Sequence, residues 1–162
     1  MTATDDRARR KARGATLSHL GDTLLAEARS MEGRAADELF RSACTTYGEA
    51  LALAPDMPDA LVGLGCARLA LAGRTSDRAA HDNLLRLARQ TLLRAHELQA
   101  EAAAYYLACV CARDGDIDGC RTWLERSKAD LHLPPAGELY ADPDLAAVRD
   151  EPWLESLFWE LT

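Results

Sequence analysis

The strongest constraint on the fold is an internal repeat with an offset of 44 to 45 residues. The pentapeptide Leu-Ser-His-Leu-Gly begins at Leu17 and Leu-Val-Gly-Leu-Gly begins at Leu61, so the closing glycines are 44 residues apart. An Ala-x3-Tyr-x2-Ala pattern starts at Ala43, and Ala-x3-Leu-x2-Ala starts 45 residues later at Ala88. The composition favours helix and no run of Val, Ile and Thr alternates as in a strand. A stack of repeated helical units is therefore predicted, because one such unit cannot bury its apolar face alone.

These motifs resemble the tetratricopeptide repeat, whose pattern is W-x2-L-G-x2-Y, A-x3-F-x2-A and then P within about 34 residues. In such a repeat, Gly21 and Gly65 let the first helix of each pair lie close to the second, and Pro55 closes the first pair. The resemblance implies an all-α fold, an α-solenoid of about three helical hairpins with C-terminal capping helices. The repeat region is expected over 14–136, divided into 14–57, 58–100 and 101–134.

The first two repeats exceed the usual length by about ten residues each. The extra residues lie around 30–38 and 74–84, between the two helices of each pair. One interpretation is that both helices are lengthened and joined by short turns near Glu32-Gly33 and Gly73-Arg74, which the apolar spacing supports. The other is an enlarged binding surface along one edge of the stack. The sequence leaves both open.

The C-terminal segment 137–162 is predicted to cap the last repeat. Asp142 before Pro143, and Asp150 before Glu151-Pro152, have the form of helix starts. A stack needs an end unit with one polar face, since its last repeat otherwise exposes apolar surface. The segment has seven acidic residues and one basic residue, as expected for a solvated outer face. Its inner face would be built from Val148, Trp153, Leu157 and Phe158.

The net charge of −7 is unevenly distributed. Residues 1–13 contain five of the 19 basic residues and two of the 26 acidic ones, which leaves 14 basic and 24 acidic residues, or −10, in the remainder. An acidic body argues against nucleic acid as a partner, because binding to phosphates needs clustered Lys and Arg. The basic arm 1–13 is expected to be solvated or disordered; contact with phosphates or an anionic membrane is the alternative.

No pattern of catalytic or metal-binding chemistry is found. The five cysteines lack C-x-x-C spacing and the four histidines form no H-E-x-x-H pair. Nucleotide-binding loops and nucleophile motifs are also missing from the sequence. We therefore expect no enzyme, no cofactor and no metal. With neither a signal peptide nor a transmembrane run in the sequence, the odd cysteine number suggests a reducing cytoplasm.

The resemblance further implies that a ligand lies in a concave groove lined by the first helix of each pair. The partner would be a protein segment, either an extended peptide or an amphipathic helix. The cations and asparagine with which some family members grip a carboxylate are missing at the matching places. The chain's own helix filling the groove is the alternative to an open one. Carried over by position, the groove residues are Ser18, Asp22, Leu25, Val62, Cys66, Leu69, Tyr105, Tyr106, Cys109 and Arg113.

The function expected from this pattern is a non-catalytic adaptor or scaffold that binds a polypeptide in the groove or along the extended edge. Two alternatives remain. One is a structural protein that self-assembles through its repeats, including as a homodimer. The other is a regulatory or chaperone-like factor for a secreted or complex-forming client, of a kind found in bacteria.

Overall fold

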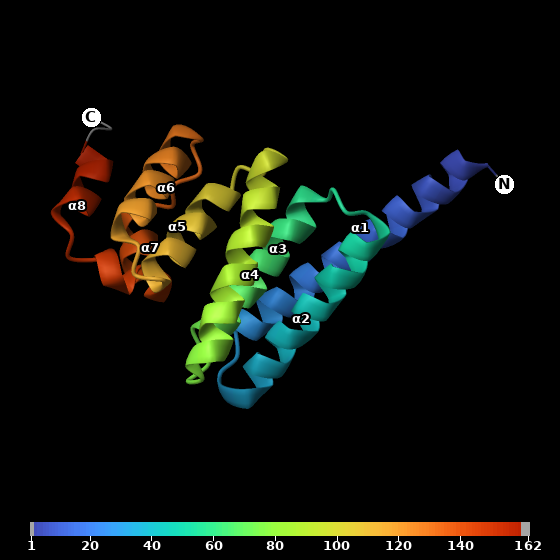
Figure 1. The fold of residues 1–162 in the computed structure, drawn as a ribbon, viewed down its shortest axis with the longest axis horizontal. Helices are drawn as coiled ribbons and strands as arrows, with labels where there is room; N and C mark the ends of the chain where they lie inside the picture. The colour runs from blue at the N-terminus through green and yellow to red at the C-terminus, as the bar shows by residue number, and fades with distance from the viewer. Residues whose placement is uncertain (1, 160–162) are drawn as a thin grey trace. The chain divides into compact units, whose positions relative to one another are not determined.

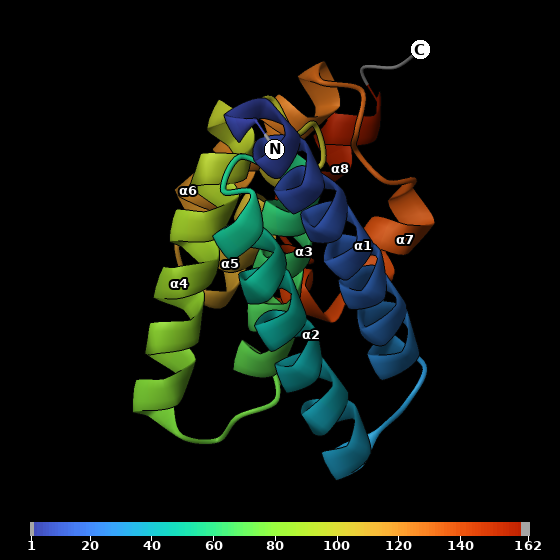
Figure 2. The same ribbon diagram turned by 90° about the vertical axis from the view of Figure 1, so that its right-hand side faces the viewer.

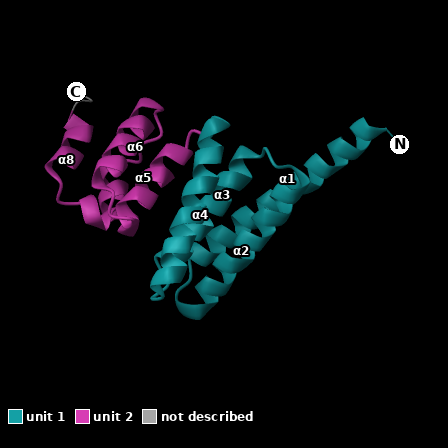
Figure 3. Ribbon diagram, in the orientation of Figure 1, with its two compact units in different colours: residues 1–100 teal, residues 101–162 magenta. Residues whose placement is uncertain are grey.

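The computed structural model describes residues 2–159, and all regular elements in this range are helical. The predicted all-α class is therefore confirmed. The chain divides into two compact units, residues 1–100 and 101–162 (Figure 3). This boundary coincides with the expected start of the third repeat. No helix in the described range has both the length and the apolar character needed to cross a membrane.

Unit 1 consists of two helical hairpins (Figure 1). The first pairs α1 (Ala3–Arg29) with α2 (Gly33–Leu53), and the second pairs α3 (Pro58–Ala72) with α4 (Arg78–Glu97). Helix α3 also packs against α1 and α2. The hairpin ends carry local signals: Gly33 has a φ of 66°, which glycine adopts without strain, and Asp77 caps α4. Of the expected extra residues, 33–38 lengthen α2 and 78–84 lengthen α4, as the first interpretation predicts, whereas 74–77 form the connection between α3 and α4.

The glycines of the repeated motif bring paired helices into close contact, as predicted. A Cβ added to Gly21 would lie 2.6 Å from Cε1 of Tyr47 in α2. At the matching place in the second repeat, a Cβ on Gly65 would lie 2.5 Å from Cγ of Leu92 in α4. Gly63 of α3 also faces the Tyr47 ring, although the motif does not predict this contact. Tyr47 therefore lies between α1 and α3, with none of its surface exposed.

The Tyr47 hydroxyl donates a 2.7 Å hydrogen bond to Oδ1 of Asp22. Burial of the ring, and next this hydrogen bond, raise the pKa of Tyr47 above its ordinary value of 10.0. The folded state then holds the phenolic proton more tightly than the unfolded state, so its stability should fall as the pH rises above about 10. We expect Tyr47→Phe to cost about 1 kcal/mol near neutral pH. Urea unfolding should show a smaller loss from about pH 8 to about pH 11 in the variant than in the wild type. Equal losses would contradict this role for Tyr47.

The basic arm is helical from Ala3 onwards, so of the two expectations for it, solvated or disordered, the structure has a solvated helix over residues 3–13. Its helix starts with a capping box in which Thr2 and Asp5 exchange hydrogen bonds at 3.3 Å. Such a box stabilises a helix start without tertiary contacts. Residues 2–13 are nevertheless exposed, and this part of α1 extends beyond the end of α2 (Figures 1 and 2).

Unit 2 contains a shorter hairpin followed by the acidic segment. Helices α5 (Ala103–Arg113) and α6 (Ile117–Ala129) form the hairpin, with Asp116 as the cap of α6. The acidic segment forms α7 (Ala136–Ala141), the 3₁₀-helix η1 (Pro143–Val148) and α8 (Pro152–Trp159). Helix η1 packs against α5, and α8 against α6. Val148 and Leu157 are buried as predicted, whereas Trp153 and Phe158 are only partly covered.

Candidate functional site

Most of the predicted groove residues of unit 1 belong to its core. Ser18 and Leu25 of α1 are buried, as are Cys66 and Leu69 of α3. Nine of the 15 residues of α3 are buried, since this helix is enclosed by α1, α2 and α4. These four side chains therefore do not line an open groove, which corrects their assignment from sequence.

The two other groove residues of unit 1 are accessible. The Asp22 side chain is 54% exposed and accepts the Tyr47 hydrogen bond, and Val62 is partly exposed. A carboxylate that already accepts a hydrogen bond and a partly exposed valine form only a small remnant of the expected surface.

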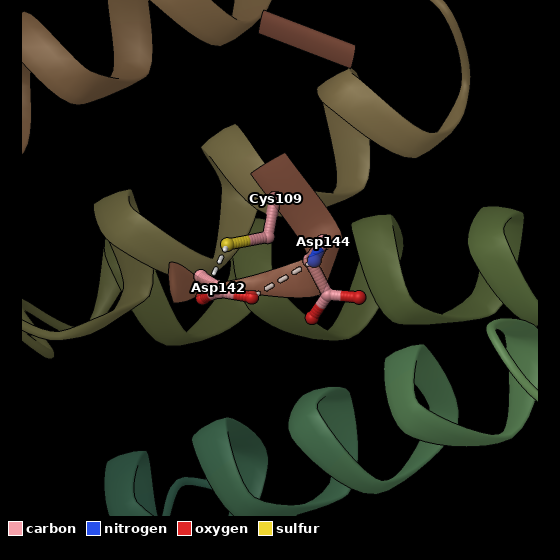
Figure 4. Close-up of side chains that lie close together, drawn as sticks. All are labelled: Cys109, Asp142 and Asp144. Atoms are coloured by element: carbon pink, nitrogen blue, oxygen red, sulfur yellow. Dashed lines mark hydrogen bonds between the residues drawn. The ribbon is translucent and has the colours of Figure 1, made fainter. Parts of the chain in front are cut away.

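In unit 2, the start of η1 covers three of the four predicted groove residues of α5. The Tyr105 hydroxyl donates a 2.6 Å hydrogen bond to Oδ2 of Asp142, and Arg113 forms an ion pair with Asp144. Cys109 is fully buried, with its thiol 3.9 Å from the same Asp142 oxygen (Figure 4). Within this unit, the alternative in which the chain's own segment covers the groove face therefore describes the structure.

The fourth groove residue of unit 2, Tyr106, is partly exposed. Its ring meets that of Tyr105 edge to face, with 5.6 Å between the centroids. It therefore packs beside one of the covered residues.

Cys109, Asp142 and Asp144 each offer one ligand atom within 4.8 Å of the others, which is close enough for a single cation. Their present partners fit a structural role better. The Asp142 carboxylate accepts bonds from the Tyr105 hydroxyl and from the backbone N–H of Asp144, at 2.6 and 2.9 Å. The guanidinium of Arg113 already supplies positive charge beside Asp144. A cation would have to displace these donors, so we interpret the cluster as a polar latch between α5 and η1.

A cleft of about 450 Å³ lies in unit 1, where the segments 30–38 and 74–84 meet. The turns α1–α2 and α3–α4 are at the same end of this unit (Figures 1 and 2). Six of the eight lining residues come from the segments 30–38 and 74–84. The cleft is therefore built mainly by the two segments that the resemblance in the sequence marks as extra residues. Its lining consists of Asp37, Arg41, Leu71, Arg74, Thr75, Ser76, Ala80 and Leu84.

Arg74 joins the two hairpins at one wall of the cleft. Its guanidinium forms an ion pair with Asp37 and donates a 3.1 Å hydrogen bond to the carbonyl oxygen of Gly33. It also lies over the Phe40 ring, 5.6 Å from the centroid, in a cation–π contact. The Arg74 and Asp37 side chains are 30% and 29% exposed. Because one side chain has three kinds of partner on α2, this wall is fixed before any ligand binds.

Hydrogen bonds also hold the α3–α4 connection in place. Nδ1 of His81 donates to the carbonyl oxygen of Ala72 at 2.8 Å. Asp77 accepts from the backbone N–H of Ala80 at 3.2 Å, and its own N–H donates to Oγ1 of Thr75 at 3.2 Å. The loop that contains Thr75 and Ser76 is thereby tied to the end of α3 and to the start of α4.

The cleft combines an apolar part with a few polar groups. Leu71, Ala80 and Leu84 are partly exposed and supply the apolar surface. The Arg41 side chain is exposed and makes no hydrogen bond or ion pair with any residue in 2–159. The sequence pointed to the insertions as an edge surface but missed Arg41 and Leu71. Only the polar run Arg74-Thr75-Ser76-Asp77 could have suggested a structured loop there.

No protein-family model, curated protein or solved structure matches the chain. The geometry of the cleft is therefore the basis for a functional assignment.

Proposed function

We propose that the protein is a non-catalytic adaptor of tetratricopeptide-like repeats, which binds a polypeptide segment in the cleft at its lengthened edge. The observation that carries this proposal is the origin of the cleft, since six of its eight lining residues lie in the two insertions. The residues that exceed the length of an ordinary repeat are thus the ones that form a concave surface.

The character of the cleft supports binding. Protein sites that hold ligands are typically concave and apolar, with a few polar groups that orient the ligand. Leu71 and Leu84 supply apolar area, whereas Arg41 and Ser76 supply side-chain donors at its rim. The Arg74 contacts fix the wall between the hairpins, so little entropy is lost in shaping the site when a ligand binds.

The concave groove expected from the family resemblance is the less favoured location. Seven of its ten residues are buried or lie beneath the acidic segment. The edge cleft, by contrast, is open to solvent and retains a charged side chain without a partner in the described range.

Filling the cleft tests the proposal. A random peptide library displayed on phage is selected against the full chain, and the enriched peptides are synthesised for affinity measurements. We expect Ala80→Trp, which places an indole in the cleft, to weaken binding by about tenfold or more.

The matched control is Ala79→Trp, at an exposed neighbouring position of α4 outside the cleft lining. It should retain wild-type affinity. Circular dichroism checks that both variants keep their helix content. The proposal is wrong if no peptide is enriched, or if the enriched peptides bind both variants equally well.

A further inference from the structure

We infer that the cleft recognises an acidic peptide segment, in which an Asp or Glu lies next to an aliphatic residue. This inference rests on the proposed function and adds the chemistry of the ligand. The carboxylate would pair with Arg41, and the aliphatic side chain would cover Leu71 and Leu84.

The side chains that line the cleft carry a net positive charge. Two arginines and one aspartate line the cleft, so their charges sum to +1. Asp37 is paired with Arg74, which leaves Arg41 as the uncompensated group. The residues beyond the basic arm sum to −10, so this positive site lies in an otherwise acidic body. A complementary ligand must therefore bring negative charge to Arg41.

The acidic residues around the cleft are already engaged. Glu38 pairs with Arg34 at 3.1 Å, and Asp82 lies 3.8 Å from Arg78. The Asp77 carboxylate caps α4. None of these three carboxylates pairs with Arg41, although Glu38 and Asp82 lie on helices that form the cleft and Asp77 directly precedes one of them. A carboxylate from a ligand would thus give this guanidinium its first charged partner.

One part of the cleft lining is apolar. Ala80 and Leu84 are one turn apart on α4 and so share a face of that helix. Leu71, near the end of α3, completes the apolar part of the lining. Covering partly exposed leucine surface is favourable in proportion to the apolar area removed from water. An acidic residue without an aliphatic neighbour would pair with Arg41 but leave the apolar part of the lining exposed to water.

The group of the cleft that would bind an anion is the guanidinium of Arg41. A guanidinium presents a planar set of donors that matches the two oxygens of a carboxylate. The Ser76 hydroxyl, exposed at the rim, can donate to a peptide carbonyl beside it. Together, these groups favour a peptide carboxylate over a neutral amide, which can accept through only one oxygen.

The experiment uses the full chain and the same random peptide library. We expect the enriched peptides to contain Asp or Glu beside Leu, Ile, Val or Met. One enriched peptide is then made in acidic, amide and lysine forms, with only the residue next to the aliphatic one changed. At low ionic strength the acidic form should bind at least about tenfold more tightly than the amide form.

Charge reversal gives the sharpest test. Arg41→Glu should reverse the preference, so that the lysine form binds best. The control Arg10→Glu makes the same change of charge at an exposed position of the basic arm, outside the cleft. It should leave the order of the three peptides unchanged. A merely structural role for Arg41 would not produce the reversal.

The outcomes separate this inference from the proposed function. If the three peptide forms bind equally and Ala80→Trp still blocks them, the acidic preference is wrong and cleft binding stands. If Ala80→Trp has no effect, cleft binding itself is wrong. If Arg10→Glu abolishes the acidic preference and Arg41→Glu does not, the carboxylate contacts the arm, and the inference is overturned.

Discussion

Replacing Gly63 with alanine is expected to lower the free energy of unfolding by about 2–3 kcal/mol, as overpacking of a filled core does. Alanine normally stabilises a helix interior by about 1 kcal/mol relative to glycine. A decrease in the free energy of unfolding, in place of this increase, would therefore itself indicate a clash. The added Cβ would overlap the Tyr47 ring. That ring cannot easily move aside, because Gly21 of α1 lies against it and Asp22 holds its hydroxyl at 2.7 Å.

The control for this prediction is Gly48→Ala in the middle of α2, where an added Cβ would meet no atom within 4 Å. With no clash to offset helix propensity, it should raise stability by up to about 1 kcal/mol. Urea unfolding followed by circular dichroism measures both variants. Similar effects of the two substitutions would show that Tyr47 is not confined as the structure has it.

The contacts of these glycines differ in whether the sequence predicts them. The repeated Leu-x-x-Leu-Gly motif predicts close approach at Gly21 and Gly65, because their partners Tyr47 and Leu92 lie in the second half of the same motif. Gly63 has no such signal. Its role depends on a ring from the preceding repeat, and this requires knowing how α3 lies against α2. Contacts within a repeat are thus more predictable than contacts between repeats.

The candidate site was harder to predict for a related reason. A groove position such as Leu69 is exposed in one packing of the helices and buried in another, and its sequence context is the same in both. The insertions could be located from repeat length alone, and with them the edge at which the cleft lies. Which side chains converge there depends on tertiary partners: Arg74 pairs with Asp37, and Arg41 is thereby left without a charged partner among residues 2–159.

The second large loss of stability is expected for Asp142→Ala, which removes the central carboxylate of the polar latch in unit 2. Asp142 accepts the Tyr105 hydroxyl at 2.6 Å and the N–H of Asp144 at 2.9 Å, so it serves both as a tertiary partner and as the cap of η1. Tyr105 is only 8% exposed, and its hydroxyl would lose this partner. Loss of the cap and of a largely buried hydrogen bond should together cost about 2–3 kcal/mol.

The matched control is Asp150→Ala, which removes the same charge from the same acidic segment. Asp150 is exposed, and its side chain makes no hydrogen bond or ion pair within 2–159, so this change should cost less than about 0.5 kcal/mol. All three tryptophans of the chain belong to unit 2, which makes their fluorescence during urea unfolding a direct probe of this prediction. Equal shifts for the two variants would mean that the latch does not hold the segment.

A double-mutant cycle then separates two contributions of Asp142 to stability: its cap on η1 and its hydrogen bond with Tyr105. Tyr105→Phe removes the hydroxyl and leaves Asp142 free to cap η1. If the pair interacts as the structure has it, the double variant should be more stable than the sum of the single losses predicts, by about 1 kcal/mol. Strict additivity would assign the whole effect of Asp142→Ala to the cap, and the acidic segment would then be held on α5 by Arg113 and by apolar packing.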